Sequence, residues 1–242
     1  MTERMGYGMA DEQGMENGLA NIQGRQLASK WAKTAALLSH GRIAPHIPPT
    51  RMFTKANLNN MLQVHGMVVI KPVRGAGGHG VIKVSKAAGV YKYTYYSRTS
   101  SFGTFDGMYK SLLANKKARP YLIQKGIQLA TIGGRPIDYR VKYVKQPTGE
   151  WRITAIVGRL AKPGLFVTNI CRGGTLLSGS EGIRRSFSSG AVVSKKREMR
   201  LLTKLSTAVL EGRFPGIGQL GFDYGIDRRG KIWIFEVNTR PQ

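Results

Sequence analysis

The chain has 242 residues, of which 41% are hydrophobic, which is enough for one large domain or two small ones with packed cores. Its only cysteine, Cys171, excludes an intramolecular disulfide framework and a cysteine-rich zinc site. Apolar runs all fall short of the roughly 20 residues that a membrane helix needs. We therefore expect a cytoplasmic protein with no membrane partner, whereas the oligomeric state is left open by the sequence.

The charge of the chain is strongly unbalanced. Lysine and arginine number 38 against 13 acidic residues, which gives a formal charge of +25. Such an excess indicates a polyanionic partner, for example an acidic peptide or polymer. Because the charges are spread along the chain, a generally basic, solvated surface without a specific ligand is the alternative. Nucleic acid is a less favoured partner, since the tyrosine-rich run 91–98 is more typical of sheet packing than of base stacking.

The first part of the chain contains helical patterns. Residues 1–24 lack periodicity and are expected to form a disordered arm. Apolar residues at helical spacing predict a helix over residues 26–39, and prolines predict an extended linker at residues 45–49. A second helix is expected from Thr54 or Asn57 to residue 64.

Strands dominate the rest of the chain. Short apolar or alternating runs predict strands at residues 67–70, 81–84, 89–97, 121–124, 137–145, 151–160, 221–226 and 231–237. Helices are expected at residues 106–115 and 194–211. Helices and strands do not alternate regularly, which favours an α+β fold over a doubly wound one.

A glycine-rich loop lies between the strands at residues 67–70 and 81–84. Its four glycines are Gly75, Gly77, Gly78 and Gly80. Glycines let the backbone fold close over an anion and direct N–H groups at phosphate oxygens, and Lys71 lies close enough in sequence to add its charge. The spacing matches neither a P-loop nor a Rossmann fingerprint, so an ordinary mobile hairpin turn is an equal alternative.

Two central segments carry polar groups among apolar ones. In the strand at residues 137–145, alternation places Asp138, Arg140 and Lys142 on one face, which is either solvated or lines a polar site. Arg159, Asn169 and Arg172 follow near a Gly-Gly turn. An arginine here can clamp a phosphoryl group or a carboxylate, but Asn169 can equally cap a turn and Arg172 can be solvated. Cys171 is expected as a small core residue rather than a nucleophile.

The last twenty residues predict a β-hairpin that carries three oxygen-bearing side chains. Strands at residues 221–226 and 231–237 flank a turn at residues 227–230, and this pairing brings Asp223 close to Glu236 and Asn238. Two carboxylates and an amide oxygen form a ligand set suited to Mg²⁺. Alternatively, the acidic residues are ordinary hairpin charges paired with Arg228, Arg229 or Arg240.

In this order the segments resemble the ATP-grasp superfamily. They are a Lys-Pro with a glycine-rich loop, a Tyr-Leu-Ile-Gln-Lys strand, an Asp-x-Arg strand, an Asn-x-x-x-Gly-Gly segment and a closing Asp…Glu-x-Asn hairpin. The chain is most similar to the YheC/YheD-type ATP-grasp proteins of spore-forming bacteria, described as endospore coat-associated. Further similarities are Ser29–Trp31, Ile47–Thr50, Gln124–Ala130, Trp151 and Val167–Asn169.

The resemblance implies an ATP-grasp fold in which two α+β subdomains hold the nucleotide between two antiparallel sheets. Residues 25–124 would form the N-terminal subdomain with the glycine-rich flap, and residues 125–242 the C-terminal subdomain with the metal site. It also implies the cofactors ATP and Mg²⁺ and a ligase that joins a carboxylate to an amine through an acylphosphate. With the charge of +25, the substrate is expected to be acidic or polyanionic.

The resemblance also assigns roles to individual residues. Phosphates would be held by Lys30, Lys71 and the flap glycines Gly75, Gly77, Gly78 and Gly80, and adenine by the hinge residues Gln124, Lys125 and Ile127. Phosphate and substrate contacts would come from Arg140, Arg159, Asn169 and Arg240, and magnesium ligands from Asp223, Glu236 and Asn238.

Some features depart from the superfamily pattern. Its members generally carry a further N-terminal substrate-binding domain, for which the segment before Lys71 is short. The hinge lacks an acidic residue for the ribose hydroxyls, so Gln128 or Gln124 would take that role. A non-catalytic polyanion-binding or spore-coat protein that keeps the fold is the main alternative, and a kinase acting on a hydroxyl is another.

Overall fold

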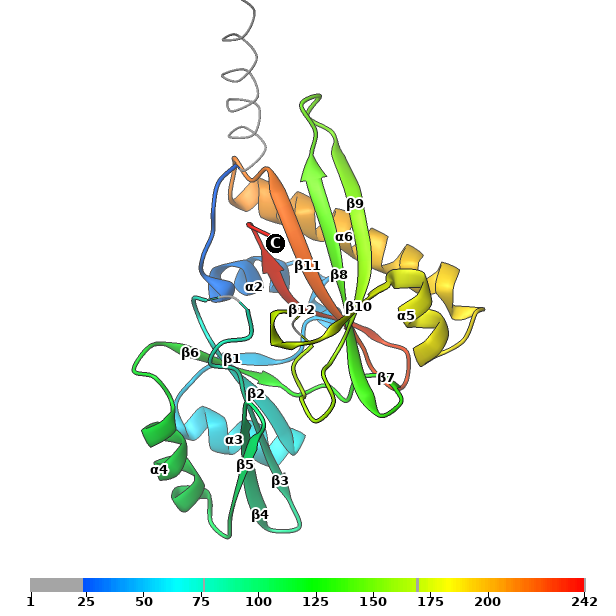
Figure 1. Ribbon diagram of the computed structural model, residues 1–242. Coiled ribbons are helices and arrows are strands. Elements are labelled where there is room, and N and C mark those ends of the chain that lie inside the picture. The colour runs from blue at the N-terminus through cyan, green and yellow to red at the C-terminus, as the bar shows by residue number, and fades with distance from the viewer. Residues whose placement is uncertain (1–23, 76, 169, 242) are drawn as a thin grey trace, which may run out of the picture.

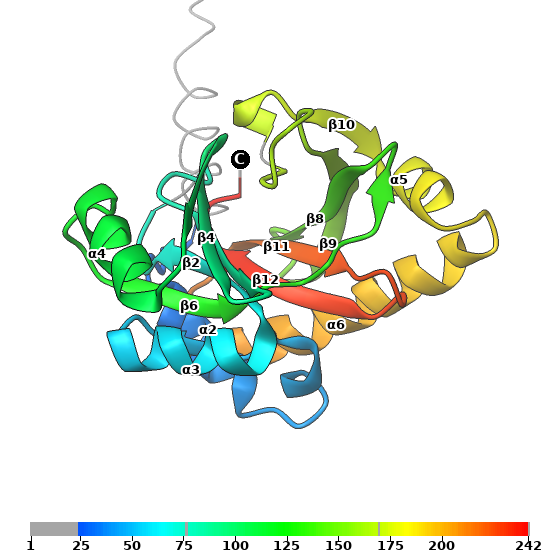
Figure 2. The same cartoon turned by 90° about the horizontal axis from the view of Figure 1, so that it is seen from below.

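The computed structural model describes residues 24–75, 77–168 and 170–241, and the strands in these ranges form two antiparallel sheets (Figure 1). The disordered arm expected at residues 1–24 therefore lies outside the described residues, apart from Gly24. Helices lie on the outer side of each sheet, and the two sheets stand next to each other (Figure 2). This mixture of helices with antiparallel strands confirms the predicted α+β class.

The first sheet has six strands in the order β1-β6-β2-β3-β4-β5. Their bounds are β1 Thr50–Met52, β2 Met67–Pro72, β3 Ile82–Ala87, β4 Val90–Tyr95, β5 Arg98–Phe102 and β6 Tyr121–Lys125. Two helices, α3 (Lys55–His65) and α4 (Phe105–Asn115), bury Leu58, Met108 and Leu112 against this sheet. The Thr54 hydroxyl caps α3 by accepting from the backbone N–H of Asn57 at 3.0 Å, which settles where that helix begins.

The second sheet has the order β10-β9-β8-β11-β12, with the short β7 paired to β8. Its strands are β7 Thr131–Ile132, β8 Arg135–Lys145, β9 Trp151–Leu160, β10 Thr175–Ser178, β11 Gln219–Ile226 and β12 Ile232–Asn238. Helices α5 (Gly179–Ser186) and α6 (Ala191–Arg213) cover its outer face. On β8, Tyr139 and Val141 are fully buried in the core, as the alternation predicted. Asp138 and Arg140 consequently face the other way, toward the first sheet.

The segment that precedes the first sheet packs against the second one. Helix α2 (Lys30–Leu38) is capped by Ser29, and Leu37, Ile43 and Ile47 join the core of the second sheet. The extended linker predicted at residues 45–49 is wrong at its start, because Pro45 lies in a 3-10 turn at Ala44–His46, where its fixed φ fits. The subdomain boundary expected near residue 124 stays a prediction.

Two differences from the predicted strands have a local cause. The single strand expected at residues 89–97 is instead the β4–β5 hairpin, which turns at Tyr96 in a left-handed conformation with φ of 57°. Tyrosine is unusual in this conformation, so no residue at this position indicated a turn. The hairpin between β11 and β12 turns where predicted, since Asp227 accepts hydrogen bonds at 2.9 Å from the backbone N–H groups of Arg229 and Lys231.

Membrane insertion by a helix has no support in the described part of the chain. None of its helices combines the length and the apolar character needed to cross a bilayer.

Candidate active site

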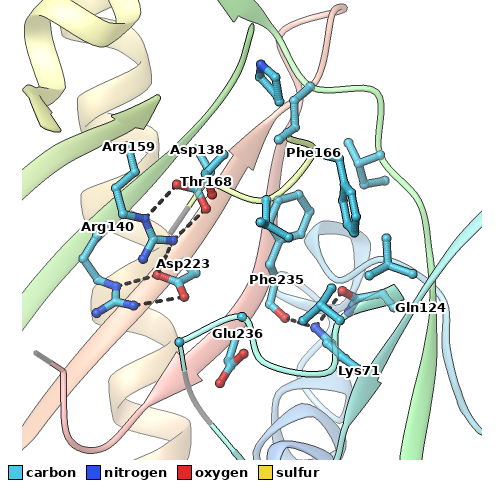
Figure 3. Close-up of a pocket in the computed structure, with 18 of the residues that line it drawn as sticks. Lys71, Gln124, Asp138, Arg140, Arg159, Phe166, Thr168, Asp223, Phe235 and Glu236 are labelled. Carbon is cyan, nitrogen blue, oxygen red and sulfur yellow. Dashed lines mark hydrogen bonds and ion pairs between the residues drawn. The ribbon is translucent and has the colours of Figure 1, made fainter. Parts of the chain in front are cut away.

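A pocket of about 720 Å³ lies between the two sheets, where β2 and β6 approach β8, β11 and β12 (Figure 3). Most of the predicted site residues line it: Lys30, Lys71, Gly75, Gly77, Gly78, Gln124, Lys125, Ile127, Arg140, Arg159, Asp223, Glu236, Asn238 and Arg240. Gly80 is not among the lining residues, and Asn169 lies outside the described residues. Residues from both ends of the chain therefore meet in one pocket.

Four charged side chains form a row across one wall of the pocket. In the sheet register, Asp138 lies opposite Arg159 and Arg140 lies opposite Asp223, so all four side chains share one face. Arg159 donates from Nε and Nη2 to the two carboxylate oxygens of Asp138 at 2.8 and 2.6 Å, and its Nη2 forms an ion pair with Asp223 at 2.9 Å. Arg140 likewise donates two hydrogen bonds to Asp223, from Nε to one carboxylate oxygen at 2.5 Å and from Nη2 to the other at 3.1 Å (Figure 3).

This row is mostly withdrawn from solvent, which strengthens its electrostatics. The side chain of Arg159 is 9% exposed and that of Asp223 is 13% exposed. Burial alone would raise the pKa of Asp223, but the guanidinium groups of Arg159 and Arg140 outweigh it and lower the pKa. Burial likewise opposes the charge of Arg159, yet Asp223 and Asp138 raise its pKa. The carboxylates therefore hold both arginines in fixed orientations.

Lysines cover the opposite side of the pocket. Lys71 is buried at the end of β2 and donates from Nζ to the Gln124 side-chain oxygen at 2.9 Å and to the backbone oxygen of Phe235 at 2.7 Å. Burial lowers the pKa of Lys71 to about 8, partly offset by the negative charge of Glu236. Lys30 forms an ion pair with Glu236 at 2.8 Å and donates to the backbone oxygen of Gly75.

The acidic trio of the terminal hairpin consists of Asp223, Glu236 and Asn238. It lies between the arginine row and the lysines. Asp223 and Glu236 are directly opposed on β11 and β12, and the Asn238 amide lies 3.5 Å from Asp223. Their ion pairs are made with Arg140, Arg159 and Lys30, whereas the alternative reading expected Arg228, Arg229 or Arg240. The described residues contain no group of three or more His, Cys, Asp and Glu residues arranged to hold a metal, so any cation site here needs the Asn238 oxygen as well.

The glycine-rich loop closes over the pocket in a conformation that requires glycine. Gly77, Gly78 and Gly80 all have φ between 66° and 78°, where other residues are strained. A Cβ atom at Gly80 would also lie 2.6 Å from the Arg119 guanidinium. The tip of the loop contacts the opposite subdomain, where the Cys171 thiol lies 3.6 Å from the Gly77 oxygen. Cys171 is exposed, so the prediction of a core residue is wrong.

The hinge at the other end of the pocket is formed differently from the expectation. The Gln124 side chain is already held by two protein partners, because its oxygen accepts from Lys71 and its nitrogen donates to Thr50 at 3.0 Å. Gln128 also lines the pocket and makes no side-chain hydrogen bond to a described residue. The backbone N–H of Gly126 donates to Met67, whereas that of Ile127 has no partner among the described residues.

Several wall residues were not singled out in the sequence. Met67, Val69, Leu129, Phe166 and Phe235 provide an apolar lining. The sequence does not indicate this role, because apolar residues are common in strands and loops. Asp138 was recognised only as part of a polar face, and its pairing with Arg159 depends on a strand register that the sequence does not state.

Comparison with known proteins agrees with this geometry. A family model described as YheC/D like ATP-grasp matches residues 20–242. The chain belongs to this family. It is 31% identical over 220 residues to the endospore coat-associated protein YheD of Bacillus subtilis (strain 168), and 27% identical over 229 residues to the endospore coat-associated protein YheC of the same organism. These matches cover 88% and 90% of the chain but 48% and 61% of the two relatives, respectively.

A solved structure shows the same fold at low sequence similarity. The N5-carboxyaminoimidazole synthase of Aspergillus clavatus, in complex with ADP and an aminoimidazole ribonucleotide, aligns with a TM-score of 0.56 and 14% identity. The alignment covers 96% of this chain and 51% of that one. Together with the family match, this confirms the predicted ATP-grasp fold of this YheC/D-like chain.

Proposed function

We propose that this YheC/D-like chain is an ATP- and Mg²⁺-dependent ligase that joins a carboxylate to an amine through an acylphosphate. One observation carries the proposal: the acidic trio, the buried Lys71, the arginine row and the glycine-rich loop all border the same pocket. A purely structural protein has no need for this combination. Solved structures of similar fold that contain ADP or ATP add support for the nucleotide.

The pocket offers a distinct place for each part of ATP. Adenine would lie among Met67, Leu129 and Phe235 and accept a hydrogen bond from the free backbone N–H of Ile127. Gln128 would reach the ribose, because Gln124 is already engaged. The triphosphate would then extend along Lys71, Lys30 and the flap glycines, where positive charge and open backbone N–H groups meet.

The side-chain oxygens of the acidic trio are suitable ligands for a magnesium ion. Asp223 and Glu236 supply carboxylate oxygens and Asn238 an amide oxygen, all from one hairpin end, and hard cations prefer oxygen ligands. Their carboxylates are at present paired with arginine and lysine, which a bound cation would share. Magnesium bound to these oxygens would supply positive charge that neutralises part of the phosphate charge.

The proposed reaction needs no general base in its first step. A carboxylate oxygen of the substrate attacks the γ-phosphorus of ATP, the bond to the β-phosphate oxygen breaks, and ADP leaves. The amine nitrogen then attacks the acyl carbon, inorganic phosphate leaves, and the amine releases a proton. Arg140 and Arg159 are oriented by Asp223 and Asp138, so they can stabilise the charge that develops on the transferring group.

Trapping of the acylphosphate tests this proposal directly. The protein is incubated with ATP, Mg²⁺, hydroxylamine as the amine, and a set of size-matched acidic and neutral carboxylates labelled with ¹⁸O. We expect a hydroxamate, ADP, and phosphate that carries one ¹⁸O atom, with acidic carboxylates preferred at low salt. A phosphorylated product without free phosphate would instead identify a kinase, and unlabelled phosphate would rule out the acylphosphate.

Removal of the Lys71 charge should weaken nucleotide binding. In Lys71→Met we expect at least a tenfold loss of affinity for ATP with Mg²⁺, because a charge-assisted phosphate contact is lost. Methionine leaves the Gln124 and Phe235 oxygens without their donor, so the melting temperature is measured alongside to show that the variant is folded. Lys92→Met, on an exposed position of β4, is the matched control and should bind as wild type does. Calorimetric titration measures both, and equal affinities for the two variants would contradict the role of Lys71.

A second function deserves a test because of the relatives' names. YheD and YheC are both called endospore coat-associated, so a non-catalytic role in a spore coat, with a polyanion as partner, is the alternative proposal. Absence of ATP binding by the wild-type protein would favour it.

A further inference from the structure

Basic side chains gather at the rim of the pocket, beside the glycine-rich loop. This rim cluster consists of His79 of the loop, Tyr96 at the β4–β5 turn, Lys117 and Arg119 after α4, and Arg172 of the opposite subdomain. Arg172 contacts the Nδ1 atom of His79 at 2.8 Å, and Arg119 donates to the backbone oxygen of His79 at 3.5 Å. Both arginines therefore converge on the same loop residue.

The arginines of the rim cluster have polar and aromatic partners but no acidic one among the described residues. Arg119 and Arg172 both contact His79, and their guanidinium groups lie over the rings of Tyr121 and Tyr96. Their Nε atoms are buried and make no hydrogen bond to any described residue. Arg140 and Arg159, in contrast, are both paired with carboxylates. Buried donors usually have a hydrogen-bond partner, and a carboxylate is one that suits a guanidinium group.

The conformation of the tyrosine in the cluster also indicates a functional site. Tyr96 adopts φ of 57°, a strained conformation for a residue with a side chain, and strain of this kind collects at functional sites. The Arg172 guanidinium lies 4.7 Å from its ring centroid, and the ring of Tyr95 stacks on it with centroids 4.4 Å apart. Tyr96 therefore orients the Arg172 guanidinium at the rim while remaining 41% exposed itself.

The rim cluster is continuous with the pocket. His79 and Gly77 of the loop and Cys171, next to Arg172, all line the pocket wall. A ligand that fills the pocket as far as His79 therefore reaches the residue that Arg119 and Arg172 both contact.

We propose that Arg119 and Arg172 form a second anion site, which binds a distal carboxylate of an extended acidic substrate such as an oligoglutamate chain. The inference rests on the proposed function, since the reacting carboxylate of the same chain would occupy the pocket. Planar guanidinium groups match carboxylates through paired hydrogen bonds, and the charge of +25 would steer such a chain toward the protein.

Direct binding of a fluorescent hexaglutamate peptide tests the site without any turnover. Arg119→Gln combined with Arg172→Gln should weaken binding at low salt by at least about tenfold. The matched control is Arg197→Gln combined with Arg200→Gln, which removes the same charge from exposed positions on α6, behind the second sheet, and should change binding less than about twofold. Equal weakening in both double variants would overturn the site, because it would show attraction by overall charge alone.

Two further measurements separate this inference from the proposed function. ATP binding with Mg²⁺ should be unchanged in the Arg119/Arg172 double glutamine variant, and a parallel loss of ATP binding would place these arginines in the nucleotide site and overturn the inference. Arg119→Lys combined with Arg172→Lys should restore part of the peptide affinity, which a variant with a folding defect would not show.

The wild-type protein also has to bind the peptide, either alone or with ATP bound. If it binds ATP but does not bind the peptide in either state, the inference is overturned and the ligase proposal stands. Tighter binding of a single-stranded oligonucleotide than of the peptide would also overturn it.

Discussion

Replacement of Asp223 by alanine should lower the free energy of unfolding by about 3 kcal/mol, because it leaves two buried guanidinium groups without their shared carboxylate. Asp223 is bound by both Arg140 and Arg159, and its side chain is only 13% exposed. The charges of the two arginines lie close together and would repel each other once the carboxylate is gone. Denaturant unfolding of the nucleotide-free protein measures the loss.

A second aspartate provides the control for this effect. Asp106 also makes an ion pair, with Lys55 at 2.7 Å, but its side chain is 76% exposed. Asp106→Ala should therefore leave the unfolding midpoint almost unchanged, since solvent screens exposed pairs. A similar midpoint shift in the two variants would mean that the arginine row does not stabilise the fold through buried charge.

The same carboxylate should make stability depend on pH. The pKa of Asp223 is lowered in the folded protein, so its ionised form stabilises the fold above the ordinary value of 3.8, and this contribution is lost as the pH falls through the lower folded pKa. In Asp223→Asn, the acid-induced loss of stability below about pH 4 should be shallower than in wild type.

Replacement of Glu236 by glutamine should weaken the binding of ATP with Mg²⁺ by at least about tenfold. The variant keeps the size of the side chain but removes one of the two carboxylates of the acidic trio. It also removes the negative charge that opposes Lys30 at 2.8 Å. Because free ATP carries more negative charge than its magnesium complex, its binding should suffer less or even improve, so the magnesium dependence itself should shrink.

Glu150 offers the matched substitution for Glu236. It is exposed at the turn between β8 and β9, and Glu150→Gln should bind ATP with Mg²⁺ as the wild type does. If Glu236→Gln retained the full difference between titrations with Mg²⁺ and with a chelator, Glu236 would not be a metal ligand.

The parts of the site that are local in sequence could be predicted. The pleat period alone placed Tyr139 and Val141 in the core and Asp138 and Arg140 on the opposite face. The terminal hairpin was predictable because an Asp-Arg-Arg-Gly turn sets which residues of its strands are opposed, as far as Tyr224 and Ile234. A β-bulge between Asp223 and Tyr224 then shifts the register and brings Asp223 opposite Glu236.

The parts that depend on long-range register could not be predicted. Arg159 and Arg140 meet Asp223 only because β8 pairs with both β9 and β11, and the segments of this pairing are far apart in the chain. The engagement of Gln124 by Lys71 and Thr50 has the same origin, since three strands of the first sheet meet there. Helix propensity likewise gives no hint that α2 packs against the second sheet.

Loops account for the remaining errors. Cys171 is apolar in character and lies between residues that suit a turn, so burial was expected, yet the segment crosses over the pocket mouth and leaves it exposed. Tyr96 forms a turn in spite of its type, which the contacts with Arg172 and Tyr95 help to stabilise. Both exceptions lie at the rim cluster, where local preference gives way to the arrangement around the pocket.

The most direct test of a magnesium–nucleotide site between the two sheets is a calorimetric titration of the wild-type protein with ATP, once with Mg²⁺ and once with a chelator. We predict saturable binding with one ATP per chain that is at least about tenfold tighter in the presence of Mg²⁺. Binding that is absent, or that has the same affinity with and without Mg²⁺, would contradict the account.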